Sequence, residues 1–246
     1  MNTTNNTVLI TGGSAGIGFA IAKLLASSGN KVIITGRDRK RLDDALEQLP
    51  GVTGIQGDVS KQADQDLLVQ TLAKNFPGVN VVINNAGKAH LHDLAKKENA
   101  FEKASDEMMT NYLSIVSLNE KLLPLLEKQK EAAIINVSSI VAIVPASIQT
   151  YSASKAALHS YTQSLRISLQ RTGSIKVFEL MPPLVNTALS AAIGGENGIA
   201  PSIVADDLLS AMQNDIFEIH VGNTKDLYEL YLKSPGEALK MMQPAA

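Results

Sequence analysis

A tyrosine and a lysine stand four residues apart, at Tyr151 and Lys155, in a stretch with helical spacing of apolar residues. Residues i and i+4 of an α-helix share a face, so the Lys155 ammonium is expected near the Tyr151 phenol. A free phenol has a pKa of about 10, and a nearby cation lowers it by favouring the phenolate. The pair could therefore exchange a proton near neutral pH, and an ordinary surface pair is the alternative.

A second candidate site is the glycine-rich run Thr11-Gly-Gly-Ser-Ala-Gly-Ile-Gly18, which follows an apolar run and precedes a helical pattern. A pyrophosphate needs backbone N–H groups pointing at it and no Cβ atoms in the way, and a helix N-terminus adds partial positive charge. The alternative is a tight turn without a ligand. The residues expected at the cofactor phosphates are Gly12, Ser14, Gly16, Ile17 and Gly18.

Short apolar runs alternate with helical patterns along the chain. The predicted strands are 7–11, 31–35, 52–56, 79–83, 133–137, 175–180 and 217–221. The predicted helices are 17–28, 38–49, 63–75, 101–128 with an interruption at Pro124, 151–171 ended by Thr172-Gly173, 203–213 and 224–241. Apolar strands that are each followed by a helix are typical of a parallel sheet covered on both faces. We therefore predict an α/β fold of Rossmann type, a doubly wound and mostly parallel seven-stranded sheet.

The bulk composition narrows the classes of function. With 246 residues, 45% of them hydrophobic, the chain fits a single domain over 1–246, and the glycine-rich segment 188–202 is predicted to be a flexible substrate lid within it. A net charge of -2, no tryptophan and no long apolar run argue against nucleic-acid and membrane partners. The lack of cysteine suits a reducing compartment, so we expect a cytoplasmic protein.

Three motifs in register point to one family. They are the T-G-x-x-x-G-x-G run, Asn84-Asn-Ala-Gly87 after the fourth predicted strand, and the Tyr151/Lys155 pair. Together they resemble the short-chain dehydrogenase/reductase (SDR) family over nearly the whole chain, in particular a DltE-like bacterial branch with a Pro-Pro-Leu-Val segment. The resemblance implies hydride transfer between a nicotinamide cofactor and a carbonyl or secondary alcohol.

The resemblance also implies a catalytic set of Asn111, Ser139, Tyr151 and Lys155. Tyr151 would exchange the proton, Lys155 would tune it and bind the nicotinamide ribose, and Ser139 would position the substrate oxygen. Asn111 would hold a water that relays protons to Lys155. The loop between Ser139 and Tyr151 is one residue shorter than the common pattern, so Ser138 is a second candidate for the serine.

The end of the second strand predicts which cofactor is used. Many relatives have an acidic residue there that binds both ribose hydroxyls and repels a 2′-phosphate. This chain has Gly36 and then Arg37, and an arginine fork suits a phosphate, so NADP(H) is favoured over NAD(H). Asp38 is a counter-argument if its carboxylate turns inward. Residues 39–41 are interpreted as the solvated start of a helix.

Further cofactor contacts follow from the resemblance. Asp58 and Val59 would meet the adenine, although a helix cap is an equal alternative for Asp58. The backbone from Asn84 to Gly87 would pass close to the adenosine ribose, with Asn84 and Asn85 mainly structural and Ala86 and Gly87 facing the cofactor. The nicotinamide would meet Pro182, Val185 and Thr187. Where the family has Pro-Gly, this chain has Pro182-Pro183.

The substrate and assembly are less well defined by the sequence. Candidate pocket residues are apolar and favour a lipophilic ketone or aldehyde: Val141, Ile143, Val144, Ile148, Leu184 and Leu189. The family implies a homodimer or homotetramer built on the helices near 101–128 and 151–171. A cofactor-sensing NADP(H)-binding protein with little turnover is the alternative function. His90 and His92 have no third ligand at suitable spacing, so no metal is expected.

Overall fold

The fold is built on one parallel sheet. The computed structural model describes residues 1–92, 96, 98–171, 173 and 175–243. The strands are β1 Thr7–Ile10, β2 Lys31–Gly36, β3 Thr53–Gln56, β4 Val79–Asn84, β5 Ala132–Val137, β6 Ile175–Met181 and β7 Glu218–His220. Their spatial order is β3-β2-β1-β4-β5-β6-β7, and every neighbouring pair is parallel. This confirms the predicted doubly wound sheet.

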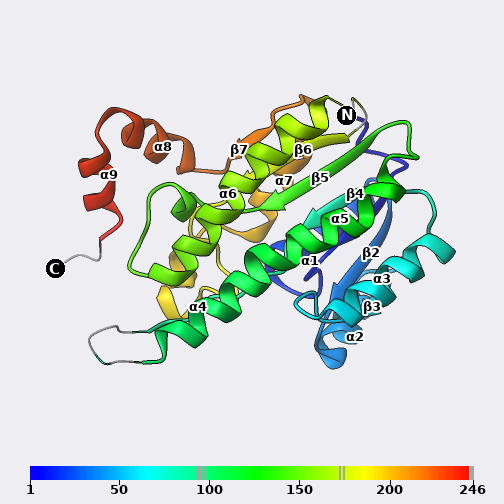
Figure 1. The fold of residues 1–246 in the computed structure, drawn as a ribbon, viewed down its shortest axis with the longest axis horizontal. Helices are drawn as coiled ribbons and strands as arrows, with labels where there is room; N and C mark the ends of the chain where they lie inside the picture. The colour runs from blue at the N-terminus through cyan, green and yellow to red at the C-terminus, as the bar shows by residue number, and fades with distance from the viewer. Residues whose placement is uncertain (93–95, 97, 172, 174, 244–246) are drawn as a thin grey trace.

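Helices cover both faces of the sheet (Figure 1). They are α1 Gly16–Ser27, α2 Arg39–Gln48, α3 Gln62–Asn75, α4 Ala100–Met108, α5 Ser114–Leu126, α6 Gln149–Gln170, α7 Pro201–Gln213, α8 Thr224–Lys233 and α9 Pro235–Met241. One buried cluster joins α1, α2 and α7 to one face of the strands, and a second joins α3, α5 and α6 to the other. Because successive strand residues point to opposite faces, the strands need apolar residues on both sides.

The region predicted as one helix over 101–128 is divided differently from the prediction. A π-helical turn, η2 Met109–Leu113, separates α4 from α5. The predicted interruption at Pro124 is wrong, because α5 continues through it to Leu126. Pro124 lies in the last turn, where a missing N–H removes a single backbone hydrogen bond of the helix. The predicted end of α6 falls partly outside the described residues, because Thr172 is not among them.

The C-terminal helical pattern consists of two helices that break at Ser234, and Pro235 occupies the first turn of α9. Both helices extend beyond the end of the sheet in Figure 1. Leu227 of α8 and Ala238 of α9 are buried in a third apolar cluster together with Val141 and Val144. Tyr151 packs against this cluster, so the end of the chain covers the loop between β5 and α6.

The segment 188–202 has local structure of its own. It contains 3₁₀ turns at Ala191–Ile193 and Gly195–Asn197. After these turns, Ile199 forms an isolated parallel bridge with Val185, outside the strands of the sheet. Its flexibility stays a prediction. Among the described residues, no helix is both long enough and apolar enough to cross a membrane.

Candidate active site

The candidate site lies where the strand order reverses, between β1 and β4. Doubly wound sheets bind ligands at such a switch point, outside the carboxyl ends of the strands. Thr11, just after β1, is joined to β4 there, since its N–H donates to the Ile83 carbonyl at 3.0 Å. Ser138, just after β5, is joined to β6 in the same way by a 2.9 Å bond from its N–H to the Leu180 carbonyl.

The glycine loop fits a pyrophosphate. Gly12 and Gly16 have φ values of +65° and +55°, which glycine adopts at little cost. A Cβ on Gly12 would lie 2.9 Å from the Ala86 Cα, and one on Gly16 would lie 3.1 Å from the Thr187 Cγ2. No side chain in the described part of the protein caps the N-terminus of α1, and its first turn has no acidic residue. The N–H groups of this turn therefore suit an anionic ligand.

Asn85 ties the end of β4 to the glycine loop. Its Nδ2 donates to the carbonyls of Thr11 at 2.9 Å and Gly12 at 3.0 Å. The Thr11 hydroxyl in turn accepts the N–H groups of Asn85 and Ala86, at 3.0 and 3.1 Å. The side chain of Asn85 thus holds two loops together, and a cofactor would meet the backbone that follows it.

The end of β2 lies close to the glycine loop. A Cβ on Gly36 would lie 3.0 Å from the Ser14 hydroxyl oxygen, so the two predicted cofactor segments face each other. Asp38 caps α2, because its Oδ1 accepts the Arg41 N–H at 3.0 Å. This bond commits one carboxylate oxygen of Asp38 to the helix.

The basic residues after β2 differ in their partners. Arg39 pairs with Asp43 at 2.8 Å, and Lys40 pairs with Asp44 at 2.7 Å, along the exposed face of α2. Arg37 is exposed, and it pairs with no carboxylate among the residues that the structure describes. The first two are solvated helix residues, whereas the Arg37 guanidinium has no such partner.

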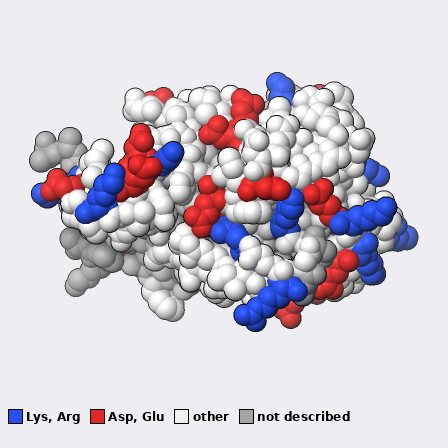
Figure 2. Space-filling model, turned by 90° about the horizontal axis from the view of Figure 1, so that it is seen from above, with Lys and Arg blue, Asp and Glu red and all other residues white. Residues whose placement is uncertain are grey.

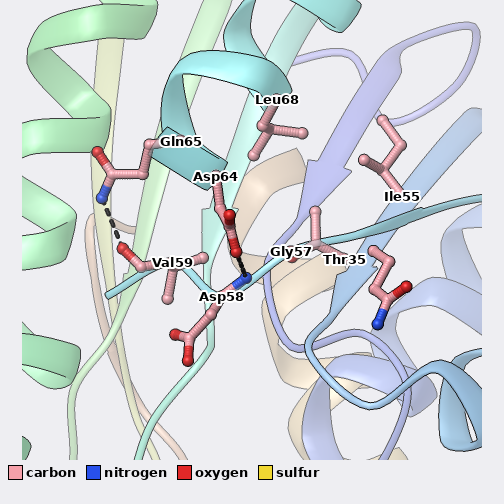
Figure 3. A pocket seen from close by; sticks show the side chains of 9 residues that line it. Thr35, Ile55, Gly57, Asp58, Val59, Asp64, Gln65 and Leu68 are labelled. Atoms are coloured by element: carbon pink, nitrogen blue, oxygen red, sulfur yellow. Dashed lines mark hydrogen bonds between the residues drawn. The ribbon is translucent and has the colours of Figure 1, made fainter. Parts of the chain in front are cut away.

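A small hollow of about 10 Å³ lies beside the ends of β2 and β3 (Figure 3). Its lining combines apolar and polar side chains and backbone: Thr35, Ile55, Gln56, Gly57, Asp58, Val59, Asp64, Gln65 and Leu68. Figure 3 shows the two bonds that shape its floor, from Gln65 Nε2 to Val59 O at 2.7 Å and from Asp58 N to Asp64 Oδ2 at 2.8 Å.

Asp58 is both part of this hollow and a local cap. Its Oδ1 accepts the N–H of Ser60 at 3.0 Å and its hydroxyl at 2.7 Å. Burial by itself would raise the pKa of Asp58, but these bonds and the charges of Lys88 and Arg37 hold it below the usual value. The carboxylate is therefore ionised and acts as a hydrogen-bond acceptor.

Tyr151 and Lys155 share a face of α6 at the edge where the strands end. The Lys155 Nζ lies 5.6 Å from the centroid of the Tyr151 ring. It also donates to the Val137 carbonyl, the last residue of β5, at 2.8 Å. Lys155 is buried, so the ammonium is fixed rather than solvated.

Burial shifts the pKa values of both Tyr151 and Lys155. Burial lowers the pKa of Lys155 to about 8, and the charge of Glu179 opposes that change. Burial, followed by the charge of Glu107, raises the pKa of Tyr151 above its ordinary value. This direction is opposite to the one expected from Lys155. The positive charge of an oxidised nicotinamide, when bound, favours the phenolate.

Asn111 lies in the π-turn η2 and is fully buried. Its Nδ2 donates to Ser154 Oγ at 2.9 Å and to Lys88 O at 2.8 Å, and its Oδ1 accepts the Lys88 N–H at 2.8 Å. A Cβ on Gly87 would lie 3.4 Å from this Oδ1 and 3.8 Å from the Lys155 Nζ. The structure thus brings Asn111, Gly87 and Lys155 together.

Ser138 and Ser139 have different environments. The Ser138 hydroxyl donates to Glu179 Oε1 at 2.5 Å. The Ser139 hydroxyl has weaker contacts, donating to Pro182 O at 3.4 Å and accepting the Val141 N–H at 3.3 Å. Ser139 can exchange these contacts for a substrate oxygen more easily than Ser138 can.

The segment after β6 is held by a residue that the sequence did not indicate. The buried Ser190 hydroxyl donates to the Val185 carbonyl at 2.5 Å and lies 3.1 Å from the Thr187 hydroxyl. Pro182 O accepts the Ile140 N–H at 3.1 Å, which joins this segment to the loop after β5. Val185 and Thr187 are therefore fixed beside the glycine loop, despite the unusual second proline.

Other residues at the site were also missed. Glu179, His159 and the C-terminal helices carry no motif in the sequence. One weak signal was present, because a glutamate in an apolar strand needs a partner if it is buried. The partner, His159, lies 20 residues away and could not be assigned from spacing.

Charged groups at the rim are paired rather than gathered into a metal site. His90 Nε2 lies 2.8 Å from Asp106 Oδ2, and Lys88 Nζ lies 2.6 Å from Asp106 Oδ1. The described residues contain no cluster of three or more potential metal ligands. Figure 2 shows acidic and basic side chains interspersed over one face of the molecule, in keeping with the net charge of -2.

Comparison with known proteins gives the family. A family model described as short chain dehydrogenase matches residues 6–198. The chain is 42% identical over 200 residues to the uncharacterized oxidoreductase DltE of Bacillus subtilis (strain 168), covering 81% of this chain and 79% of the relative.

Solved structures share the fold at lower identity. A short chain dehydrogenase from Burkholderia cenocepacia J2315 in complex with NADP has a TM-score of 0.86 and 24% identity, with coverage of 98% of this chain and 99% of that one. An SDR from Burkholderia phymatum in complex with NAD has a TM-score of 0.87 and 20% identity, with coverage of 100% and 98%. The fold thus accommodates both cofactors. The chain belongs to the short-chain dehydrogenase/reductase family of oxidoreductases, in its DltE-like branch.

Proposed function

We propose that this protein is an NADP(H)-dependent reductase of lipophilic ketones or aldehydes, which also oxidises the corresponding alcohols. The observation that carries the proposal is the buried Lys155 ammonium, anchored on the Val137 carbonyl at 2.8 Å and one helical turn from Tyr151. An acid–base pair in this position suits proton exchange with a carbonyl oxygen at the end of β5.

Each residue has a distinct role in the proposed reaction. A nicotinamide, when bound, would supply or accept the hydride at the carbonyl carbon. In the reducing direction Tyr151 gives its proton to the carbonyl oxygen, and Lys155 favours the phenolate that remains. Ser139 donates a hydrogen bond to the same oxygen. Asn111 bonds the backbone N–H and carbonyl of Lys88. It supports proton exchange between Lys155 and solvent.

The preference for NADP(H) rests on the end of β2. The Arg37 guanidinium has no carboxylate partner in the described part of the chain, and it suits the 2′-phosphate of the adenosine ribose. The Asp38 side chain caps α2, which weakens the main counter-argument. The adenine ring would lie against Asp58 and Val59, which follow β3.

The apolar cluster beside Tyr151 supports a lipophilic substrate. The loop after β5 contributes Val141 and Val144, and the C-terminal helices contribute Leu227. Leu184 and Leu189 are 37% and 49% exposed near the segment 188–202, which we propose as the substrate lid. We also propose a homo-oligomer through α4–α6, where exposed apolar side chains include Phe101 and Ile167.

The function can be tested with a panel of ketones and aldehydes offered with NADPH and with NADH. We expect turnover with NADPH that falls by at least about a thousandfold in Tyr151→Phe, because the proton donor is lost. Tyr161→Phe is the matched control, since Tyr161 lies on the same helix and its hydroxyl accepts a bond from Asn119 at 3.3 Å. Tight NADPH binding without turnover of any carbonyl would favour the cofactor sensor instead.

The cofactor preference has a separate test. Arg37→Ala should lower the NADPH-to-NADH ratio of kcat/KM by about tenfold, whereas Arg39→Ala should leave that ratio nearly unchanged. Arg39 is the suitable control because its guanidinium already pairs with Asp43. A wild-type preference for NADH would overturn the role of Arg37 and leave the proposed chemistry intact.

A further inference from the structure

A row of polar side chains crosses the sheet at one level. Asn84, Asn136, Glu179 and Glu218, here called the polar row, are register partners on the successive strands β4 to β7. Three of them are fully buried or nearly so, and Glu218 lies at the sheet edge. Buried polar groups are costly unless they are hydrogen-bonded, so a row of them in the core calls for a purpose.

Most of the row is satisfied by side chains from the helices above it. Asn84 donates to Asn119 of α5 at 2.9 Å, and Asn136 donates to Thr162 of α6 at 2.9 Å. These pairs hold the helices on the sheet, which is a structural role.

Glu179 has a different set of partners. It is fully buried, and its carboxylate lies 2.9 and 3.0 Å from His159 Nδ1. It also accepts the Ser138 hydroxyl at 2.5 Å. Burying a carboxylate and its histidine partner costs desolvation free energy that apolar packing at the same place would not. Its bond to Ser138 reaches the segment that enters the active site.

The Glu179–His159 pair lies behind the residues of the proposed reaction. Tyr151, Lys155 and His159 follow one another at intervals of four residues on α6, so they share a helix face. The Lys155 Nζ donates to the Val137 carbonyl at 2.8 Å, and the carboxylate of Glu179 accepts the hydroxyl of the next residue, Ser138. The Val137–Ser138 peptide is therefore fixed from both sides, immediately before Ser139.

We propose that Glu179 and His159 are positioning residues of the reductase: they anchor Ser138 and thereby fix the strand end that supports Lys155 and presents Ser139. This inference rests on the proposed function. It gives Ser138 a role of its own, as the residue that anchors the strand end, while Ser139 meets the substrate oxygen.

The pair also makes the strand end sensitive to pH. The hydrogen bond to Glu179 raises the pKa of His159, burial opposes this, Glu218 raises it further and Arg166 lowers it. His220 of β7 lies close enough to couple to His159. As pH rises through the raised pKa, His159 loses its proton and Glu179 loses its cationic partner. The anchor should then loosen.

Glu179→Gln tests the anchor, because it keeps the shape and removes the charge. We expect kcat for carbonyl reduction to fall about ten- to a hundredfold while the KM for NADPH changes little. The pH dependence of kcat should also move to lower pH by about one unit, because Lys155 loses a nearby negative charge. Glu218→Gln is the matched control in the same row, since Glu218 bonds Arg166 and not Ser138. An unchanged pH profile in Glu179→Gln would overturn the proposal.

A second measurement does not depend on turnover. Proton–carbon NMR of the histidine rings, with His159→Gln for assignment, should show the His159 titration moving to lower pH in Glu179→Gln. If the wild type reduces no carbonyl but this titration moves, the proposed function fails and the charge pair stands. If turnover is present and neither the titration nor the pH profile moves, the pair has no positioning role.

Ser138→Ala covers the case in which Glu179→Gln does not fold. It should lower kcat about tenfold with the His159 titration little changed, because the charge pair remains. A wild-type kcat in Ser138→Ala would overturn the anchor. A loss equal to that of Ser139→Ala, with an unchanged pH profile, would make Ser138 a direct substrate contact and would also overturn it.

Discussion

The two halves of the sheet carry their proposed functions by different means. In the cofactor half, β1–β3 with α1–α3, the site is made largely of backbone, which packs closely around Gly12, Gly16 and Gly36. In the catalytic half, β4–β7 with α4–α9, it is made of side chains such as Tyr151 and Lys155. A ligand that brings its own phosphates needs N–H groups and room, whereas proton transfer needs groups held in place.

The difference reaches into the core. The polar row crosses the catalytic half, and its members are bonded to α5 and α6. In the cofactor half the buried strand residues are mainly apolar, and the Thr35 hydroxyl has no partner among the described residues. In the catalytic half, the proposed catalytic side chains at the strand ends are thus accompanied by the polar row within the sheet.

Among the substitutions that test the difference between the two halves, the one at Lys155 is expected to have the largest effect. Its folded pKa of about 8 lies below the 10.5 of an ordinary lysine. Between these values the unfolded chain binds a proton that the folded protein has released, so the stability of the wild type rises with pH. We expect Lys155→Met to be more stable than the wild type below pH 8, and this advantage should shrink by about 3 kcal/mol by pH 10.5.

Urea unfolding at several pH values measures this difference. Lys23→Met, at an exposed position of α1, is the control and should follow the wild type in parallel at every pH. Parallel curves for Lys155→Met as well would mean that Lys155 is not held in a costly charged state. The catalytic half would then resemble the cofactor half.

The next largest effect is expected in the cofactor half, at Gly18. A Cβ there would lie 2.4 Å from the Asn85 Nδ2 and 2.5 Å from the Gly12 carbonyl oxygen, so the junction of the two loops must shift. Gly18→Ala should raise the Kd for NADPH by about thirtyfold or more, near 2 kcal/mol. Fluorescence titration gives the Kd. Gly236→Ala is the control, because its Cβ would meet nothing within 4 Å; equal affinities in both variants would refute a site made of backbone.

The smallest effect compares one substitution in both halves. Thr162 is buried, its hydroxyl accepts the Asn136 Nδ2 at 2.9 Å and it donates to Leu158 O at 2.7 Å. Thr162→Val should cost about 1–2 kcal/mol, because the Asn136 amide is left without a partner. Thr35→Val, equally buried, should be neutral or stabilising. Thermal unfolding of both variants checks this, and equal losses would remove the distinction between the halves.

Much of the fold could be predicted because its signals are local. Most of the strands are apolar runs, and most of the helices have apolar residues at helical spacing, so both signals lie within a few residues. The π-turn and the course of α5 through Pro124 could not be predicted, because both are decided by how the helix packs on the sheet. The packing of α8 and α9 against Tyr151 depends on contacts between residues far apart in the chain.

The candidate site could be predicted where a motif has fixed spacing, as in the glycine loop and the Tyr151/Lys155 pair. The different environments of Ser138 and Ser139 could not, because the hydroxyl of Ser138 is bonded to Glu179, a residue 41 positions away. Ser190 was missed for a similar reason, since only the three-dimensional structure shows that its hydroxyl donates to the Val185 carbonyl.

The π-turn at Met109–Leu113 has a consequence for how one long helix meets two surfaces. An α-helix turns by about 100° per residue, so one additional residue rotates everything before it relative to everything after it. In this protein α4 packs against α6, while α5 packs against α3 and β4. A regular helix would present one continuous stripe, and the extra residue lets two differently oriented stripes share a single axis.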